Sequence, residues 1–144
     1  MRRIAFVTLC ALLLLCGCRT NGQTAASEEI DRTVTVINDV QEADIWILPQ
    51  TEKNMKTTVW GTATVSKAPV GEPRQASIPE PGDDGYYMFR MIDTEQFYYS
   101  ANGITLKEGW TVAIKGTVPD SVTVEVTDEN GVLQGTYEVF AARL

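Results

Sequence analysis

The sequence SVTVEVTDENGVLQGTYEVF, residues 121–140, alternates apolar and polar side chains on both sides of a turn. In its first half three valines fall on one face, while threonine and glutamate fall on the other. This period of two, rich in β-branched residues, is typical of strands with one buried face. Between the halves, Asn130-Gly131 is expected to supply the positive φ angles of a tight turn. The stretch therefore predicts a β-hairpin with strands at 121–127 and 132–140.

On the second strand of this hairpin, the alternation places Leu133, Tyr137 and Val139 on the inner face. The same period recurs along the chain and predicts six further strands, at 33–38, 43–49, 57–66, 86–92, 95–100 and 110–116. No segment has a sustained helical period. The proline-rich residues 67–82 are expected to form a loop, with a short edge strand around 76–78.

Short strands separated by regular turn signals predict an all-β fold. We expect an antiparallel β-sandwich of about 7–9 strands, immunoglobulin-like or related in architecture. A small closed β-barrel is the alternative.

The N-terminus has a different character. Two arginines precede an apolar run at residues 4–16, which is shorter than the roughly 20 residues a membrane-spanning helix needs. Its length and flanks are typical of a secretory signal peptide. The run ends in Leu15-Cys16-Gly17-Cys18, which resembles the lipobox of bacterial lipoproteins. An uncleaved signal anchor, or cleavage at another position, is the alternative.

The lipobox resemblance implies that a lipid is attached to the thiol of Cys18 and that cleavage follows Gly17. It divides the chain into a signal peptide (1–17), a lipidated cysteine with a flexible polar tether (18–32) and a folded domain (33–144). At least a diacylglyceryl group, with palmitate among the expected acyl chains, would give durable anchoring. The expected location is extracytoplasmic, on the cell membrane or the outer membrane.

Composition narrows the chemistry of the domain. The chain has a net charge of −7. Loss of residues 1–17 would remove Arg2 and Arg3, which makes the mature chain more acidic still. Nucleic-acid binding needs clusters of basic residues, so this class of partner is disfavoured. An acidic domain is also not expected to lie flat on an anionic membrane.

The chain has no histidine, and its three cysteines are Cys10, Cys16 and Cys18. The expected domain therefore lacks the residues of serine–histidine and cysteine–histidine catalysis. It also lacks nearly all ligands for zinc, copper and haem. Disulfides within the domain are excluded, so a hydrophobic core must stabilise the fold alone. We expect no enzymatic activity.

Several positions between residues 34 and 115 resemble small, uncharacterised bacterial secreted or lipoprotein β-sandwich domains. Those domains show an Asn after the first strand, a Trp-Gly pair, a "YDIR…D" strand and a late "L-x-x-G". The matching positions here are Asn38, Ile45, Ile47, Trp60-Gly61, Gly71, Ile78, Tyr87, Phe89, Arg90, Asp93, Tyr98, Ile104, Leu106 and Gly109. Met88 departs from this pattern. The resemblance implies a β-sandwich and no particular activity.

Aromatic residues supply the candidate core and the candidate binding surface. Trp60 is expected in the core beside a bulge or close approach of strands. The other expected core residues are Tyr87, Phe89, Met91, Trp110, Val112 and Ile114. Trp46, Tyr86, Tyr98 and Tyr99 cannot all point inward. We therefore predict a possible binding surface at Trp46, Tyr86 and Tyr99. Burial beneath the 67–85 loop is the alternative.

Acidic residues gather in several predicted turns. If turns alternate between the two ends of the sandwich, those at 39–44, 67–85, 101–109 and 128–131 share the end away from the membrane. Carboxylates in such loops can bind Ca²⁺, and the candidate ligands are Asp83, Asp84 and Asp128. No D-x-D-x-D-G spacing is present.

These observations favour a membrane-anchored extracytoplasmic lipoprotein. Its expected role is that of a non-enzymatic binding or structural module for an envelope protein or a glycan. The alternative is a Ca²⁺- or carbohydrate-binding module that uses the acidic loops. A small hydrolase built on two carboxylates is the least favoured. Apart from the covalent lipid, no cofactor is expected.

Overall fold

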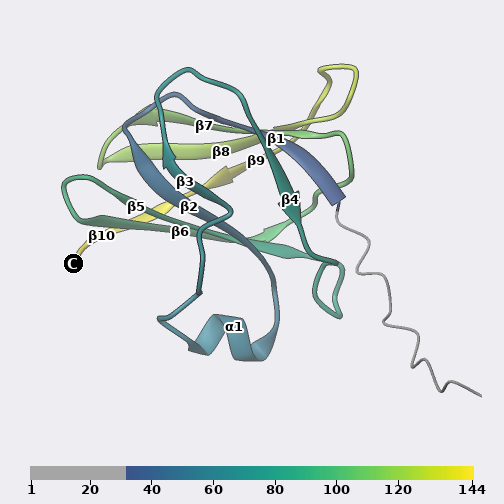
Figure 1. Cartoon of the computed structure of the whole chain (residues 1–144), viewed down its shortest axis with the longest axis horizontal. Helices are drawn as coiled ribbons and strands as arrows, with labels where there is room; N and C mark the ends of the chain where they lie inside the picture. The colour runs from purple at the N-terminus through teal and green to yellow at the C-terminus, as the bar shows by residue number, and fades with distance from the viewer. Residues whose placement is uncertain (1–31) are drawn as a thin grey trace, which may run out of the picture.

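Two sheets pack face to face in the structure, a computed structural model that describes residues 32–144 (Figure 1). The first sheet has the order β4 (Arg74–Ile78), β1 (Arg32–Asn38), β7 (Thr111–Thr117), β8 (Ser121–Thr127), β9 (Leu133–Glu138). The second has the order β10 (Phe140–Arg143), β6 (Phe97–Ile104), β5 (Tyr87–Asp93), β2 (Ala43–Pro49), β3 (Val65–Ala68). The predicted all-β sandwich is confirmed, and the sheets do not close into a barrel. The predicted signal peptide and the lipidation site at Cys18 lie outside the described residues.

The hairpin at 121–140 forms, with differences at its turn. The three valines of β8 are buried, and Val124 pairs with Tyr137 as the alternation requires. At the turn only Gly131 has a positive φ, of 79°, whereas Asn130 does not. The Asp128 carboxylate accepts hydrogen bonds from the backbone N–H groups of Asn130 and Val132, both at 2.9 Å.

Leu133 does not point inward as predicted, and its side chain is 55% exposed. The register shifts between Val126 and Thr127, so that Leu133 pairs with Thr127 instead of continuing the alternation. Directly opposed residues lie on the same face of an antiparallel pair, and Thr127 is on the outer face. The register shift between Val126 and Thr127 therefore turns Leu133 outward.

The strand predicted at 132–140 is divided between the two sheets. Its first part, β9, pairs with β8, whereas β10 pairs with β6 in the other sheet. Val139 lies between them and is half-buried. Because one predicted strand becomes two and the short edge strand forms as β4, residues 32–144 contain ten strands rather than the predicted 7–9.

The pairing of β1 with β7 is parallel, and it breaks the expected alternation of turns. Residues 39–42, between β1 and β2, lie at the end of the sandwich where β1 finishes. By contrast, the connections at 105–110 and 128–132 lie at the end where β1 begins, because β7 runs parallel to β1 and β8 antiparallel to β7. The prediction that the acidic turns share one end is therefore wrong.

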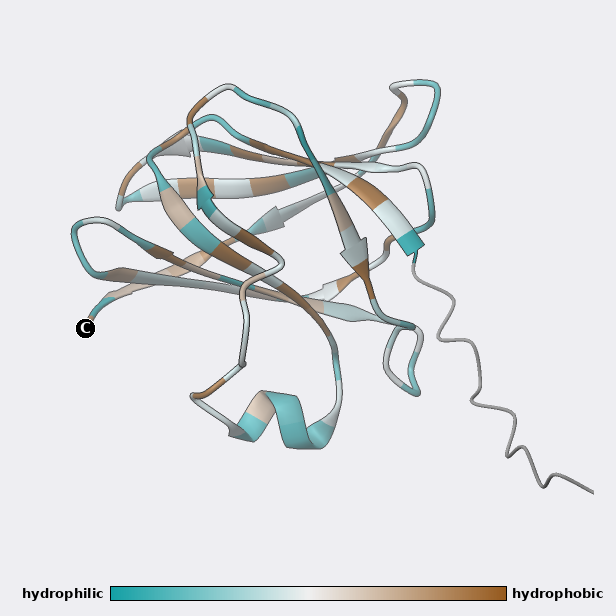
Figure 2. Cartoon of the chain, in the orientation of Figure 1, coloured by the Kyte–Doolittle hydropathy of each residue, from teal (hydrophilic) through white to brown (hydrophobic). Residues whose placement is uncertain are grey.

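The core lies between the sheets, where the hydrophobic side chains of both inner faces meet. Figure 2 shows hydrophobic positions alternating with hydrophilic ones along several strands. Six core residues predicted from alternation are buried as expected: Tyr87, Phe89, Met91, Trp110, Val112 and Ile114. Polar groups in this interior are paired. Tyr99 donates a hydrogen bond of 2.8 Å to Asp93, whose other oxygen accepts from the backbone N–H groups of Glu95 and Phe97.

The connection between β2 and β3, residues 50–64, corrects the predicted strand at 57–66. The connection carries α1 (Glu52–Lys56), the single helix among residues 32–144. Only the last two residues of the predicted strand, 65 and 66, belong to a strand in the structure, where they begin β3. Thr51 caps the helix by accepting a hydrogen bond of 3.1 Å from the N–H of Asn54. No helix within the described part of the chain is long and apolar enough to cross a membrane.

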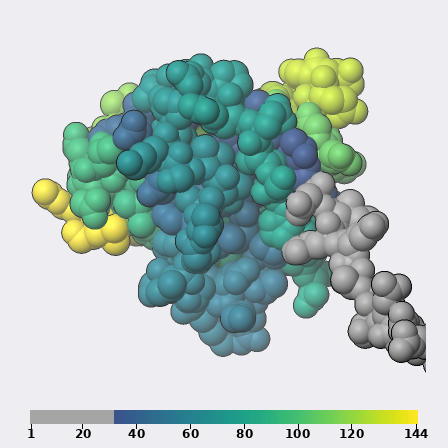
Figure 3. Space-filling view, viewed as in Figure 1, coloured from purple at the N-terminus to yellow at the C-terminus, as the bar shows by residue number. Residues whose placement is uncertain are grey.

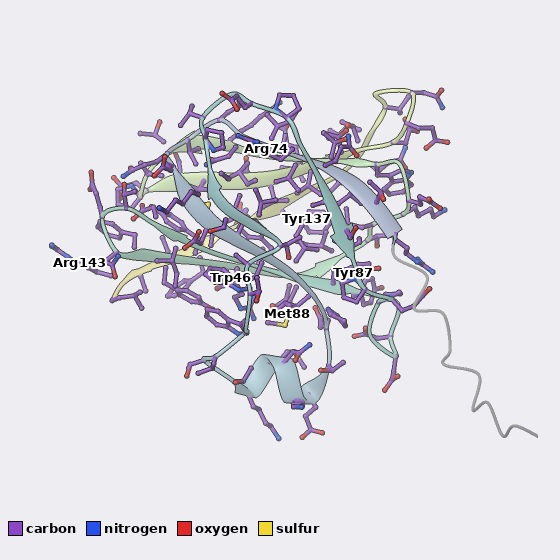
Figure 4. All side chains as sticks on the ribbon, viewed as in Figure 1. Trp46, Arg74, Tyr87, Met88, Tyr137 and Arg143 are labelled. Carbon is purple, nitrogen blue, oxygen red and sulfur yellow. The ribbon has the colours of Figure 1, made fainter. Side chains whose placement is uncertain are left out.

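This connection covers the outer face of the second sheet. Figure 3 shows the α1 region as a protrusion that is continuous with the body of the molecule, and Figure 4 shows Met88 between β5 and α1. Met88 points away from the inter-sheet core, yet it is fully buried. The second sheet is thus covered on both sides at β5.

Candidate functional site

Three aromatic rings meet on the outer face of the second sheet. Trp60, from the covering connection, stacks on Tyr98 of β6 with ring centroids 5.6 Å apart and planes at 11°. It also meets Trp46 of β2 at 5.7 Å and 59°. These distances and angles are those of favourable offset and tilted aromatic pairs.

Backbone hydrogen bonds fix both indoles. The Trp46 Nε1–H donates to the carbonyl of Gly61 at 3.1 Å, and the Trp60 Nε1–H donates to the carbonyl of Thr57 at 3.1 Å. The Trp46 bond ties the connection to β2, whereas the Trp60 bond lies within the connection, which meets β6 through the stacking of Trp60 on Tyr98. The rings are therefore held in place before any ligand arrives.

The structure divides the predicted aromatic surface. Trp46 is partly exposed and joins the cluster, but Tyr99 is fully buried between the sheets, so its predicted place on a surface is wrong. Tyr86 is 42% exposed and makes no ring contact with the cluster. Trp60 was predicted in the core, and it lies instead on the opposite face of the second sheet.

Arg90 lies beside the aromatic cluster and is only 6% exposed. Its Nη1 donates to three oxygens, namely the carbonyls of Phe89 and Ala101 and the side-chain oxygen of Asn102, at 2.7–3.0 Å. All three acceptors are uncharged. Among the described residues no carboxylate lies within 4.0 Å of this guanidinium.

Burial lowers the pKa of Arg90 from its usual value, and the neighbouring Tyr98 hydroxyl acts in the opposite direction. An arginine retains its proton in proteins even so. The outer face of β5 therefore carries a buried positive charge that is solvated by carbonyl and amide dipoles and has no anionic partner within residues 32–144.

A hollow of about 350 Å³ opens at this place. It is lined by Met55, Lys56, Thr57, Thr58, Trp60, Arg90, Ile92, Tyr98 and Leu144. These are two cationic residues, two threonines, two aromatic residues and apolar side chains, with no Asp or Glu. The chain has a net charge of −7, so a lining with two basic residues and no Asp or Glu has the opposite sign of charge to the chain as a whole.

Two other hollows, each with a different lining, are present in the described part of the chain. One, of about 310 Å³, includes Asp44 and Asp93. Both carboxylates are engaged within the fold, because Asp44 accepts from Ser66 and from the N–H of Lys67 and Asp93 is bonded to Tyr99. The other lies along β10 and measures about 370 Å³.

The candidate calcium ligands are not gathered. Asp84 accepts from Gln50 and from the N–H of Tyr86, Asp83 is exposed, and Asp128 closes its own hairpin. Among residues 32–144, no three His, Cys, Asp or Glu side chains lie close enough together to hold a metal ion.

Fold and site together define an all-β sandwich with an aromatic- and arginine-lined hollow on one sheet face. No protein-family model, no curated protein and no solved structure matches the chain.

Sequence reasoning did not select Arg90 or the hollow. Alternation along β5 puts Met88, Arg90 and Ile92 on the face away from the core, where a polar strand face is normally solvated. Two apolar residues flanking an arginine on that face indicate that something covers it, and this signal was available in the sequence. The sequence did not show which segment covers this face, because residues 50–64 are distant from β5 in the chain.

Proposed function

We propose that this protein is a lipid-anchored, extracytoplasmic, non-enzymatic binding module whose binding surface is the outer face of the second sheet. The observation that carries the proposal is the hollow formed by Trp60, Tyr98 and Arg90. The resemblance of Leu15-Cys16-Gly17-Cys18 to a lipobox supports the anchor. The partner is an envelope glycan or protein.

The residue types at this face favour binding. Tryptophan, tyrosine and arginine are the residues that contribute most at interfaces, and ligand sites combine apolar walls with a few well-placed polar groups. Here the polar group is Arg90, and the rings are positioned in advance by backbone hydrogen bonds. Preorganisation of this kind reduces the entropy lost on binding.

The same lining supports a role without catalysis. General acid–base and nucleophilic mechanisms rely mostly on His, Asp, Glu, Cys or an activated Ser or Lys. The lining of the hollow offers Lys56 and two threonines, and it contains no Asp or Glu that would activate them.

Site-specific photo-crosslinking in the producing cell tests this function. A photoreactive residue replaces Thr58 at the rim of the hollow, and the matched control replaces Ser77, which is exposed on β4 at the far edge of the first sheet. We expect a discrete adduct from position 58 and none from position 77. Equal labelling from both positions, or none from position 58, would contradict the proposal.

A further inference from the structure

One edge of the Arg90 guanidinium is unused. Nη1 makes every hydrogen bond of this side chain that is 3.5 Å or shorter within residues 32–144, so Nε and Nη2 have no partner at that distance there, although the Tyr98 hydroxyl lies beside the guanidinium. Among the described residues, no fully shielded side-chain nitrogen lacks a hydrogen-bond partner, so Nε and Nη2 of Arg90 keep some access to solvent. Arg90 is one of the residues that line the hollow. The N–H groups of Nε and Nη2 project in parallel, which is the fork that a carboxylate accepts with two oxygens.

The surroundings of this fork select for negative charge. Lys56 is the second cation of the lining, and it forms an ion pair with Glu52, which lies on the same helix outside the lining. The lining itself has no Asp or Glu, although acidic residues outnumber basic ones in the chain by 19 to 12. A buried charge without a partner is costly, and an anion in the hollow would offset that cost. The hollow is therefore complementary to one anionic group.

Resting on the proposed function, we propose that the hollow binds a carboxylated sugar residue of an acidic glycan. The carboxylate is held by the Nε and Nη2 fork of Arg90, and the sugar ring packs against the aromatic side chains of Trp60 and Tyr98. Thr58 supplies a hydroxyl at the rim. The volume of about 350 Å³ lies within the roughly 300–1,000 Å³ of ordinary ligand pockets.

The position of the hollow favours a sugar over a peptide. Extended peptides commonly bind by adding a strand to a free sheet edge, where main-chain hydrogen bonds supply the affinity. The floor of this hollow is formed by β5 and β6, which are paired on both sides. It therefore offers aromatic faces and a charged fork, and no unpaired strand edge.

Titration of the full chain in detergent tests the proposal, with tryptophan fluorescence and calorimetry as readouts. The probes are an oligogalacturonate, its neutral methyl ester, a short peptide with a free C-terminal carboxylate, and inorganic phosphate. We expect saturable binding of the oligogalacturonate and binding of the ester that is at least about tenfold weaker. Stronger binding of the peptide, or displacement of the sugar by equimolar phosphate, would overturn the assignment to a carboxylated sugar.

Variants locate the binding at the hollow. Arg90→Lys keeps the charge and loses the fork, so we expect affinity for the oligogalacturonate to fall at least about tenfold. Lys56→Gln should weaken binding by about 2–5-fold, and Lys53→Gln, an exposed neighbour on the same helix outside the lining, should leave it unchanged. Lys56 is exposed, so this comparison remains decisive if Arg90→Lys reduces folding. Equal effects of the two lysine variants would overturn the proposal.

The two proposals fail in distinguishable ways. If position 58 crosslinks an envelope partner but the oligogalacturonate does not bind, the ligand class is wrong and the binding module stands. If neither position 58 nor any probe gives a signal, the binding face itself is wrong.

Discussion

Three polar side chains are buried in the described domain: Asn38, Arg90 and Asp93. Two of them support the fold. Asn38 donates to the carbonyl of Ala68 at 3.0 Å and so joins the end of β1 in one sheet to β3 in the other. Asp93 receives hydrogen bonds from its own turn and from the Tyr99 hydroxyl. Arg90 differs because part of its hydrogen-bonding capacity is unused.

The Tyr99–Asp93 pair makes the fold sensitive to alkali. Burial, together with the Asp93 carboxylate, raises the pKa of Tyr99 well above its usual value of 10.0. Above about pH 10 the unfolded chain loses this proton and the folded chain keeps it. The free energy of unfolding therefore falls as pH rises from about 10 toward the folded-state pKa.

Tyr99→Phe tests this coupling. At pH 7 we expect the free energy of unfolding to drop by about 1–3 kcal/mol, because the buried Asp93 loses a donor. Above pH 10 the variant should lose stability less steeply than the unaltered protein. Urea unfolding at a series of pH values measures both effects, with Tyr98→Phe as the control on the other face of the sheet. Parallel pH profiles for Tyr99→Phe and the unaltered chain would refute the coupling.

Cys18 carries the predicted anchor. Cys18→Ser should move the protein from the membrane fraction to the soluble extracytoplasmic fraction, because the thiol that accepts the lipid is gone. Cell fractionation and mass spectrometry of the N-terminus measure the change, and Cys16→Ser is the matched control. Retention of the Cys18→Ser protein on membranes with a cleaved signal peptide would contradict the lipobox interpretation.

Among the elements, the β8–β9 hairpin shows how far a local pattern reaches. The valines of β8 and the turn between the strands follow the sequence. The details of the turn differ from the prediction, because only Gly131 has a positive φ, whereas both Asn130 and Gly131 were expected to have one. In addition, the register shift turns Leu133 outward.

The turn makes a sharp prediction about neighbouring residues. Gly131→Ala should reduce the free energy of unfolding by about 1 kcal/mol, since φ of 79° strains a residue with a β-carbon. Asn130→Ala should change it by less than about 0.5 kcal/mol, because the φ of Asn130 is not positive. Thermal or urea unfolding distinguishes the two. Equal losses would indicate a turn with both residues in the left-handed region.

The covering connection is the element that sequence patterns describe least well. Residues 57–66 are rich in β-branched side chains, yet most of them form no strand, because no neighbouring strand receives them. Their place is set by Trp60 against Trp46 and Tyr98, which are contacts between residues far apart in the chain.

For the molecule as a whole, the sandwich presents two unlike faces. The outer face of the first sheet carries the paired surface charges of Lys115 and Glu125, 2.7 Å apart. The outer face of the second carries a cover, an aromatic cluster and an uncompensated arginine. Acidic turns occur at both ends, because the parallel pairing of β1 with β7 places the connections differently from a simple up-and-down order.

This distribution of carboxylates predicts the response to calcium. Adding millimolar Ca²⁺ to the full chain should leave its melting temperature unchanged, because Asp83, Asp84 and Asp128 are not gathered into one coordination sphere. Differential scanning calorimetry with Mg²⁺ as the matched cation measures this. A Ca²⁺-specific rise in melting temperature would revive the calcium-binding alternative.

Much of the fold could be predicted from the sequence. Six of the eight predicted strands are present with ends shifted by a few residues, and the edge strand at 76–78 forms as part of β4. The candidate site was predicted only in part. Of the residues predicted for a binding surface, Trp46 lies in the aromatic cluster on the outer face, and Tyr99 is buried between the sheets. Alternation alone could not say which face of β6 meets the core.

The sequence by itself determined that the domain is built of strands and that it has no histidine and no cysteine after Cys18, because side-chain alternation and composition are local properties. Only the tertiary structure decided which strands pair, where the strand at 132–140 changes sheet, and that Trp60 covers β5 beside Arg90. The physical reason is that sheet partners and covering contacts join residues tens of positions apart, and the whole set of neighbours decides which face of each strand is buried.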